Sequence, residues 1–475
     1  MNKEKVARKA TFGESLIIII IAFVILLVSI VVFKADAQIP LFLASVIVTV
    51  FAFYLGLKWE NIEMAIFDSI KTALLPMVII MLIGVTVGTW IACGTVPYLI
   101  YWGLQLISPT WFLVTACIMC SIMSLSTGSS WTTAGTIGVA LMGVGMGLGI
   151  PPAMTAGAVV SGSFFGDKLS PLSDSTNFAA AVGGTSLFEH VNSMMWTTIP
   201  ALLISWVIYA IMGLRFSGAI ATPEGVVLML QGIEQTYNLN VALLIPLIVL
   251  LVLIIKKVPA IISIAIAALT GAIVGMTIQG IGFGDMLKYM LSGFVGNTGI
   301  PDVDRLLTRG GMTAMLGTIS IMFMSLSLAG ILDVTGCLEA AFSKLANIVK
   351  SVLGLITTCL ASSLVLNFLA ADPYLPMLMT SKIFGASYDE KGIDRKVLSR
   401  TLEDTGTLGC AMVPWGTSGV YMSATLGVAV FSYLPFYLLG IITPVVSMVL
   451  AASGIGIFYK DGVKRGVFYK NKQLN

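Results

Sequence analysis

The sequence contains a stretch of 95 residues, from Thr72 to Gly166, without a single Asp, Glu, Lys, Arg or His. Charges follow at once, because Asp167, Lys168 and Asp174 stand within the next eight residues. A charge at the centre of a bilayer costs about 2.5–3.5 kcal/mol on insertion scales. A chain that avoids charge for so long and then places three together, with apolar sequence on both sides, is expected to hold a polar site inside a membrane.

The composition places the chain among polytopic membrane proteins. Charged residues make up 10% and hydrophobic residues 57% of the sequence, whereas a soluble domain has about 25% charged residues. The formal net charge of +3 is small, and the basic residues lie near the ends of apolar runs, so nothing indicates nucleic acid as a partner. All six cysteines lie in apolar segments, and we interpret them as buried small hydrophobic residues.

Eight apolar runs are long enough to span a bilayer: residues 15–33, 39–57, 73–92, 200–214, 241–255, 259–278, 311–332 and 436–457. Between them lie two longer regions, 109–184 and 351–427, which Gly, Pro, Ser and charged residues interrupt. Each region contains a polar hairpin tip followed by a break, and the two layouts correspond at a shift of about 240 residues.

Basic residues indicate the orientation, because cytoplasmic loops are enriched in Lys and Arg. Clusters stand at both termini, at Lys256–Lys257 and between Lys391 and Arg400. If the two tips are re-entrant hairpins, each half crosses five times and every cluster lies inside. An odd count inverts the second half relative to the first, so we expect an all-α protein of two inverted-topology repeats with about ten transmembrane helices, two re-entrant hairpins and two broken helices. Hairpins that cross fully would give about twelve to fourteen spans instead.

The expected domains follow from this plan. The first repeat covers residues 1–214, with its transport part at about 109–184. A connection covers 215–240, the second repeat covers 241–459 with its transport part at about 351–427, and a cytoplasmic tail covers 460–475.

The first break and the first hairpin tip carry candidate ligands for a small hard cation. The expected binding residues of the first half are Asp167, Lys168, Ser170, Ser173, Asp174, Asn177, Ser129 and Ser130. Sodium prefers oxygen ligands, and Gly166 and Pro171 interrupt the helix so that backbone carbonyls lose their partners. Lys168 has two possible roles, lowering the proton affinity of Asp167 or standing in for sodium in one state. The alternatives are a buried ion pair that holds a broken helix, or a loop at the membrane surface.

The second half offers Asp372, the pair Glu403–Asp404, Trp415 and Thr417 as further binding residues. Asp372 lies in the second half at the position that corresponds to the tip of the first hairpin. We place the second break from Glu403 through Thr417. Asp167, Asp174 and Asp372 are the candidates for a sodium site. The alternative for the carboxylate pair is a salt bridge to Arg395 or Arg400. The single histidine, His190, is expected at the membrane interface, with pH sensing as the other interpretation.

No Walker A loop, nucleophile elbow, zinc pair or dinucleotide fingerprint is present. We therefore expect no enzymatic activity and no cofactor beyond transported sodium and protons. Energy coupling is expected to come from an ion gradient or from a partner protein.

Four segments carry a family resemblance: Thr127–Thr133, Gly166–Asp174, Thr401–Thr407 and Pro414–Ser423. Together they resemble the NhaC-type sodium/proton antiporter family, over nearly the whole chain. The resemblance implies a multi-pass transporter of the bacterial inner membrane, with both termini cytoplasmic, a homodimeric assembly and contacts with membrane lipids. It implies sodium/proton exchange by alternating access, while some members exchange organic acids or move amino acids.

The chain departs from the family pattern at two places. Gly416 and Ser418 stand where Asn and Cys are common, and Pro373 stands where Gln is common. Because Gly416 removes an amide and leaves space, the alternative is a sodium- or proton-coupled carrier of a small organic acid or amino acid. A channel or non-transporting subunit fits the two inverted halves less well.

Overall fold

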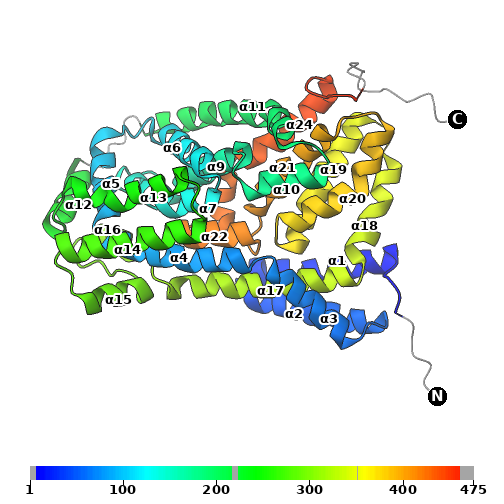
Figure 1. Ribbon diagram of the computed structural model, residues 1–475, viewed down its shortest axis with the longest axis horizontal. Helices are drawn as coiled ribbons and strands as arrows, with labels where there is room; N and C mark the ends of the chain where they lie inside the picture. The colour runs from blue at the N-terminus through cyan, green and yellow to red at the C-terminus, as the bar shows by residue number, and fades with distance from the viewer. Residues whose placement is uncertain (1–6, 217–222, 350, 461–475) are drawn as a thin grey trace.

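The chain is built from helices in a computed structural model that describes residues 7–216, 223–349 and 351–460. Figure 1 shows most of these helices running along the long axis of the molecule. Within the described residues, the β-pairing consists of two isolated bridges, Phe294 with Arg309 and Ile393 with Tyr459. Apart from Lys460, the predicted cytoplasmic tail lies outside the described residues, as do Lys3, Lys5 and residues 217–222 of the predicted connection.

The helices of the first half alternate between long apolar segments and short broken ones. They are α1 Phe12–Leu27, η1 Val28–Val32, α2 Gln38–Tyr54, α3 Trp59–Lys71, α4 Leu74–Ala92, α5 Thr95–Leu106, α6 Phe112–Thr127, α7 Ser130–Thr133, η2 Ala134–Gly138, α8 Val139–Gly147, α9 Pro152–Leu169, α10 Asp174–Gly183 and α11 Leu187–Leu214.

The second half has a similar alternation. Its helices are α12 Pro223–Thr236, η3 Val241–Leu244, α13 Ile245–Ile255, α14 Ala260–Ile278, α15 Phe283–Ser292, α16 Pro301–Leu307, η4 Thr313–Met315, α17 Leu316–Val334, α18 Cys337–Ile348, α19 Val352–Ala370, α20 Tyr374–Glu390, α21 Arg395–Cys410, α22 Thr417–Leu426, α23 Val430–Tyr433, η5 Leu434–Phe436 and α24 Leu438–Ser453.

Six helical segments of the described chain are long and apolar enough to cross a membrane, and eight if each of two bent pairs counts as one span. The six lie at α1, α4, α11, α14, η4–α17 and α19. The bent pairs are α12 with α13, at 94°, and α22 with α23, at 84°. The expectation of an all-helical polytopic protein with broken helices is therefore confirmed.

The helix breaks lie close to where the sequence predicts them, with two exceptions. Gly166, predicted to interrupt the helix, lies inside α9. The first hairpin turns at Gly128 (φ 67°) and the second at Ala371 (φ 56°), both left-handed. The first break separates α9 from α10. The prediction that the second break begins at Glu403 is wrong, because α21 continues through Cys410. The first proline after this segment is Pro414, so nothing in the sequence stops the helix earlier.

Corresponding turns recur in the two halves. Left-handed glycines separate α4 from α5 at Gly94 and α17 from α18 at Gly336. The ten-residue helices α10 and α22 end at left-handed Gly184 and Gly427. In each pair the two positions are about 240 residues apart, as expected for an internal repeat.

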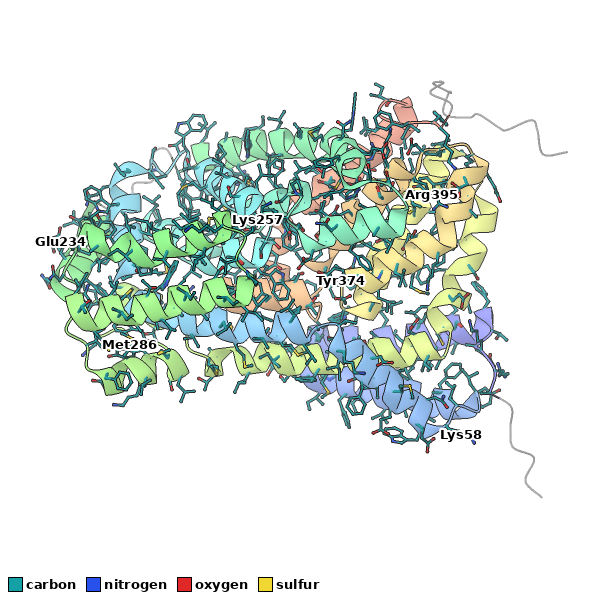
Figure 2. The ribbon with its side chains drawn as sticks, viewed as in Figure 1. Lys58, Glu234, Lys257, Met286, Tyr374 and Arg395 are labelled. Atoms are coloured by element: carbon teal, nitrogen blue, oxygen red, sulfur yellow. The ribbon has the colours of Figure 1, made fainter. Side chains whose placement is uncertain are left out.

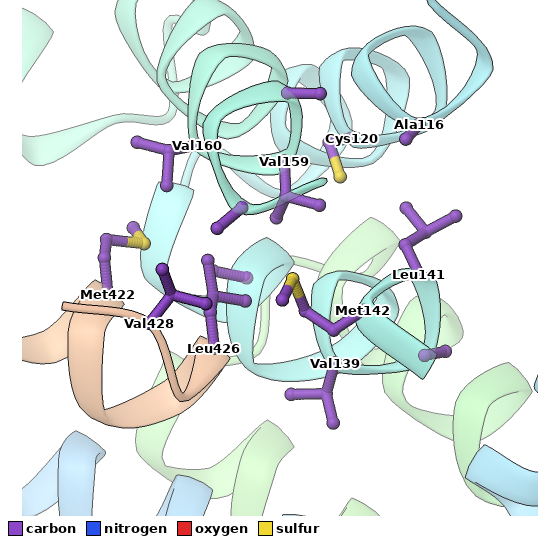
Figure 3. Close-up of a cluster of buried hydrophobic side chains, with 14 of the residues drawn as sticks. Ala116, Cys120, Val139, Leu141, Met142, Val159, Val160, Met422, Leu426 and Val428 are labelled. Carbon is purple, nitrogen blue, oxygen red and sulfur yellow. The ribbon is translucent and has the colours of Figure 1, made fainter. Parts of the chain in front are cut away.

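The largest apolar core joins α6, α8, α9 and α22 (Figure 3). Val159 of α9, Cys120 of α6, Met142 of α8 and Leu426 of α22 are all buried there. Small residues let α6 and α9 approach closely, as is common between membrane helices. A Cβ atom on Gly162 would lie 2.2 Å from the carbonyl oxygen of Cys117.

We expect Gly162→Ala to destabilise the protein. The added methyl must push α9 away from α6, and overpacking of this kind costs about 1–3 kcal/mol. The measurement is the unfolding temperature of the purified protein in detergent. Gly317→Ala is the matched control, because a Cβ there meets nothing within 4 Å. Equal unfolding temperatures for the two variants would contradict the close packing of α6 on α9.

Candidate functional site

A cavity of ≈ 770 Å³ lies where the two hairpin tips and the two breaks meet. Figure 2 labels two of its lining residues, Lys257 and Tyr374, near the middle of the molecule. The predicted binding residues that line it are Ser129, Ser130, Asp167, Ser173, Asp174, Asp372 and Thr417. The structure thus brings residues from both halves to one internal site, as the sequence predicts.

Asp167 is the most constrained carboxylate of the cavity. It ends α9 and is 9% exposed. The hydroxyl of Ser130 donates to its Oδ2, and the hydroxyl of Ser173 donates to its Oδ1, both at 2.6 Å. Each carboxylate oxygen has a second lone pair, so Asp167 can still ligate a cation or take a proton.

Asp372 and Asp174 contribute differently. Asp372 is 7% exposed, and its Oδ2 accepts from the backbone N–H groups of Tyr374 (2.9 Å) and Leu375 (3.3 Å) at the start of α20. Asp174 is exposed in the first turn of α10. Among the described residues, no three His, Cys, Asp or Glu side chains converge on one point. The three aspartates therefore share a cavity without forming one ligand cluster.

Lys168 and the carboxylate pair lie behind the cavity wall. The ammonium group of fully buried Lys168 pairs with Oδ1 of Asp404, which also accepts from the Thr197 hydroxyl at 3.0 Å. Glu403 is also fully buried, and its Oε2 lies 2.8 Å from Nε2 of His190. The sequence-based alternative of salt bridges to Arg395 or Arg400 is not what the structure has, because these carboxylates pair with residues of the first half.

The His190 side chain is buried, whereas an interfacial role would require it to face a surface. The residue lies in the first turn of α11, and its side chain is fully buried between Glu403 and Ser399. Its neighbours Phe188 and Glu189 are exposed. The sequence shows a short amphipathic stretch here, but the partners of His190 come from α21, more than 200 residues later.

Three predicted residues have structural contacts instead of lining the cavity. The Trp415 indole donates to the carbonyl of Phe368 at 2.7 Å. The Ser170 hydroxyl accepts from the N–H of Leu172 at 3.3 Å, and the Asn177 amide donates to two backbone carbonyls of the same loop. These groups fix the shape of the two breaks.

The space expected at Gly416 is absent. A Cβ there would meet the carbonyl oxygen of Cys410 and Cβ of Val413, both at 3.0 Å. Gly416 therefore packs against the end of α21 and does not enlarge the cavity.

Lys257 is a charged residue of the cavity that the sequence does not predict as part of the site. The sequence predicts a cytoplasmic turn at Lys256–Lys257, and in the structure Lys257 lines the cavity from the turn between α13 and α14. Its left-handed backbone (φ 58°) is unusual for a lysine. No sequence signal distinguishes it from its neighbour Lys256.

Comparisons with known proteins identify the family of this chain. The profile of the family described as Na+/H+ antiporter family matches residues 6–176 and 162–455. This chain belongs to the Na+/H+ antiporter family. The resemblance drawn from the sequence motifs is thereby confirmed.

Relatives within the Na+/H+ antiporter family carry several names. The Na(+)/H(+) antiporter NhaC of Alkalihalophilus pseudofirmus is 37% identical over 97% of this chain and 100% of its own length. The arginine/ornithine antiporter ArcD of Halobacterium salinarum is 38% identical over 96% and 94%, respectively. The malate-2H(+)/Na(+)-lactate antiporter of Bacillus subtilis is 36% identical over 94% and 95%.

Proposed function

We propose that this chain is a secondary active transporter that exchanges sodium for protons at Asp167. The observation that carries the proposal is the position of this carboxylate, which faces the cavity between two broken helices and is held by two hydroxyl groups. Carboxylate and hydroxyl oxygens suit sodium. A proton on Asp167 removes the charge that sodium needs, so each ion excludes the other.

Coupling follows from the cost of an empty site. An ionised Asp167 with neither ion would have to cross the membrane interior as an uncompensated charge, which is unfavourable. The site therefore changes sides mainly when it is loaded with sodium or a proton. Sodium/proton exchange by this mechanism requires only the carboxylate and hydroxyl groups of this chain.

The test is transport by the purified protein in liposomes. An outward-directed proton gradient should drive uptake of radioactive sodium, and collapse of that gradient by an ionophore should stop it. Liposomes without protein give the background. Uptake equal to this background would refute the proposal.

A second candidate is exchange of an organic cation such as a basic amino acid. The cavity is far larger than a sodium ion, and the charged side chains of its described lining are three aspartates and one lysine. This charge pattern favours a cation over an organic anion. This candidate would be favoured if arginine at micromolar concentration competed with sodium uptake and was itself taken up into the liposomes.

We further infer two inverted repeats with ten crossings, both termini in the cytoplasm of a bacterium, and a homodimer. The recurring left-handed turns of the two halves support the repeats. Lys58 and Arg395 lie at one end of the molecule in Figure 2, and Glu234 and Met286 at the opposite end. Basic residues at the first end suit the cytoplasmic side.

Cysteine labelling in intact cells tests this topology. We expect Ser108→Cys and Glu234→Cys to react with an impermeant maleimide from outside and Lys391→Cys not to react. The six native cysteines are buried, so the unmodified protein supplies a low background. Labelling of the Lys391→Cys variant from outside would contradict the orientation.

A further inference from the structure

Asp167 is connected to His190 by a continuous chain of side-chain hydrogen bonds through two serines of the cavity lining, Ser173 and Ser175, and through buried Glu403. Ser173, which donates to Asp167, lies 3.0 Å from the hydroxyl of Ser175. The Ser175 hydroxyl donates to Oε1 of Glu403 at 3.3 Å. The other oxygen of Glu403 contacts His190. The chain thus starts at the proposed ion site and ends in the first turn of α11.

The contacts of His190 place one proton between His190 and Glu403. In one tautomer the Ser399 hydroxyl donates to the carbonyl of Lys396 at 3.1 Å and accepts from Nδ1 of His190 at 2.8 Å. The 2.8 Å contact between Nε2 and Glu403 then needs one further proton, which lies on either group. In the other tautomer Ser399 donates to Nδ1, and Nε2 carries the hydrogen of the Glu403 contact.

We propose that the His190–Glu403 pair holds one exchangeable proton and passes it to Asp167 through Ser175 and Ser173. The inference rests on the proposed sodium/proton exchange, and it assigns the proton an entry point separate from that of sodium. Sodium reaches Asp167 through the cavity, whereas the proton enters at the first turn of α11. There His190 lies beside the exposed residues Phe188 and Glu189.

The relay conserves protons at every step. Glu403 breaks its O–H bond and gives the proton to Ser175, whose own hydroxyl proton moves to Ser173. Ser173 passes its proton to Oδ1 of Asp167, so both serines end with one proton each. When Glu403 is ionised, Ser175 donates to it and Ser173 donates to Asp167. No proton then lies between the two serines, and the chain is interrupted.

The other charged groups around the pair mostly have contacts of their own, but Nε and Nη2 of buried Arg400 have no hydrogen-bond partner among the described residues. Helix α20, which packs on α21, carries Lys382, Asp389 and Glu390, and Asp389 pairs with Arg395 and Lys460. Lys168 of α9 pairs with Asp404 of α21, and the Arg400 guanidinium donates to the carbonyls of Ser193 and Gly456. Lys396 lies over the ring of Phe458. Glu189 of α11 accepts from its own cap, and the charged residue of α10 is Asp174 at the cavity. The packed helices α6 and α24 carry no charge in sequence. Among the described residues, the ion pair of Glu403 is the one with His190.

The experiment separates two fluxes in liposomes. Sodium/sodium exchange at equal pH needs no net proton movement, whereas sodium/proton exchange does. We expect Glu403→Gln and His190→Gln to lower sodium/proton exchange on the order of 10²-fold, the usual contribution of a positioned proton donor. Sodium/sodium exchange should stay close to the wild-type rate.

Ser175→Ala keeps the inference testable if the buried variants fail to fold. It removes the link between the two carboxylates and should also lower only sodium/proton exchange. Thr176→Val is the matched control. Thr176, like Ser175, donates to Glu403, at 3.2 Å, but its contact with Asp167 is to the backbone carbonyl, so it does not link the two carboxylate groups.

The outcomes are distinct. Wild-type sodium/proton exchange in the Ser175→Ala and Glu403→Gln variants would overturn the relay, and so would an equal loss of both fluxes. Absence of both fluxes from the wild-type protein would instead refute the proposed function itself.

Discussion

Asp167→Asn should abolish sodium/proton exchange while leaving the protein folded. Asparagine has the same shape, and its amide can still bond to the hydroxyls of Ser130 and Ser173. It lacks the negative charge and cannot take up a proton. Two unit charges about 4 Å apart at an effective dielectric near 20 attract by about 4 kcal/mol, so sodium affinity should fall about 10³-fold.

Asp174→Asn is the matched control for this experiment. Asp174 lies in the same break and lines the same cavity, but it is exposed. Exposed charge interactions contribute at most about 1 kcal/mol, so the effect on affinity should not exceed about fivefold. Sodium uptake into liposomes and the unfolding temperature in detergent are the two measurements. Wild-type uptake by the Asp167→Asn variant, or an equal loss in the control, would move the ion site away from Asp167.

The sequence predicts the fold and the location of the site because both depend on local patterns. Long apolar runs predict spans, and clusters of Gly, Pro and charge predict where helices end. The charge-free stretch before Asp167 and the polar tip at Ser129–Ser130 locate the cavity without any knowledge of distant contacts.

The partners of the buried charges cannot be predicted in this way. Lys168 and Asp404 come from different halves, as do His190 and Glu403. The sequence offers Arg395 or Arg400 as the partner of Glu403, because residues close in sequence are the first candidates for a contact. Only the packing of α9, α10 and α11 on α21 decides which charges meet.

Lys168→Met should be among the most destabilising single substitutions in the chain. Lys168 and Asp404 are both fully buried and paired. Removal of the ammonium group leaves Asp404 with the Thr197 hydroxyl and without its directly paired cation. Breaking one side of a buried ion pair typically costs 3–5 kcal/mol, so we expect about that loss in the free energy of unfolding.

The double variant Lys168→Met, Asp404→Asn distinguishes lost charge balance from lost packing. It removes both charges with little change in volume, and buried pairs replaced by neutral groups are often no less stable. We therefore expect most of the stability to return. Lys288→Met is the surface control, because Lys288 pairs with Asp285 at 2.9 Å with both side chains more than half exposed, and its loss should cost at most about 1 kcal/mol. Unfolding by increasing SDS fraction in mixed micelles measures all three. If the double variant were as unstable as Lys168→Met alone, the uncompensated charge of Asp404 would not be the cause of the loss, and the charge pair would not be what joins α9 to α21.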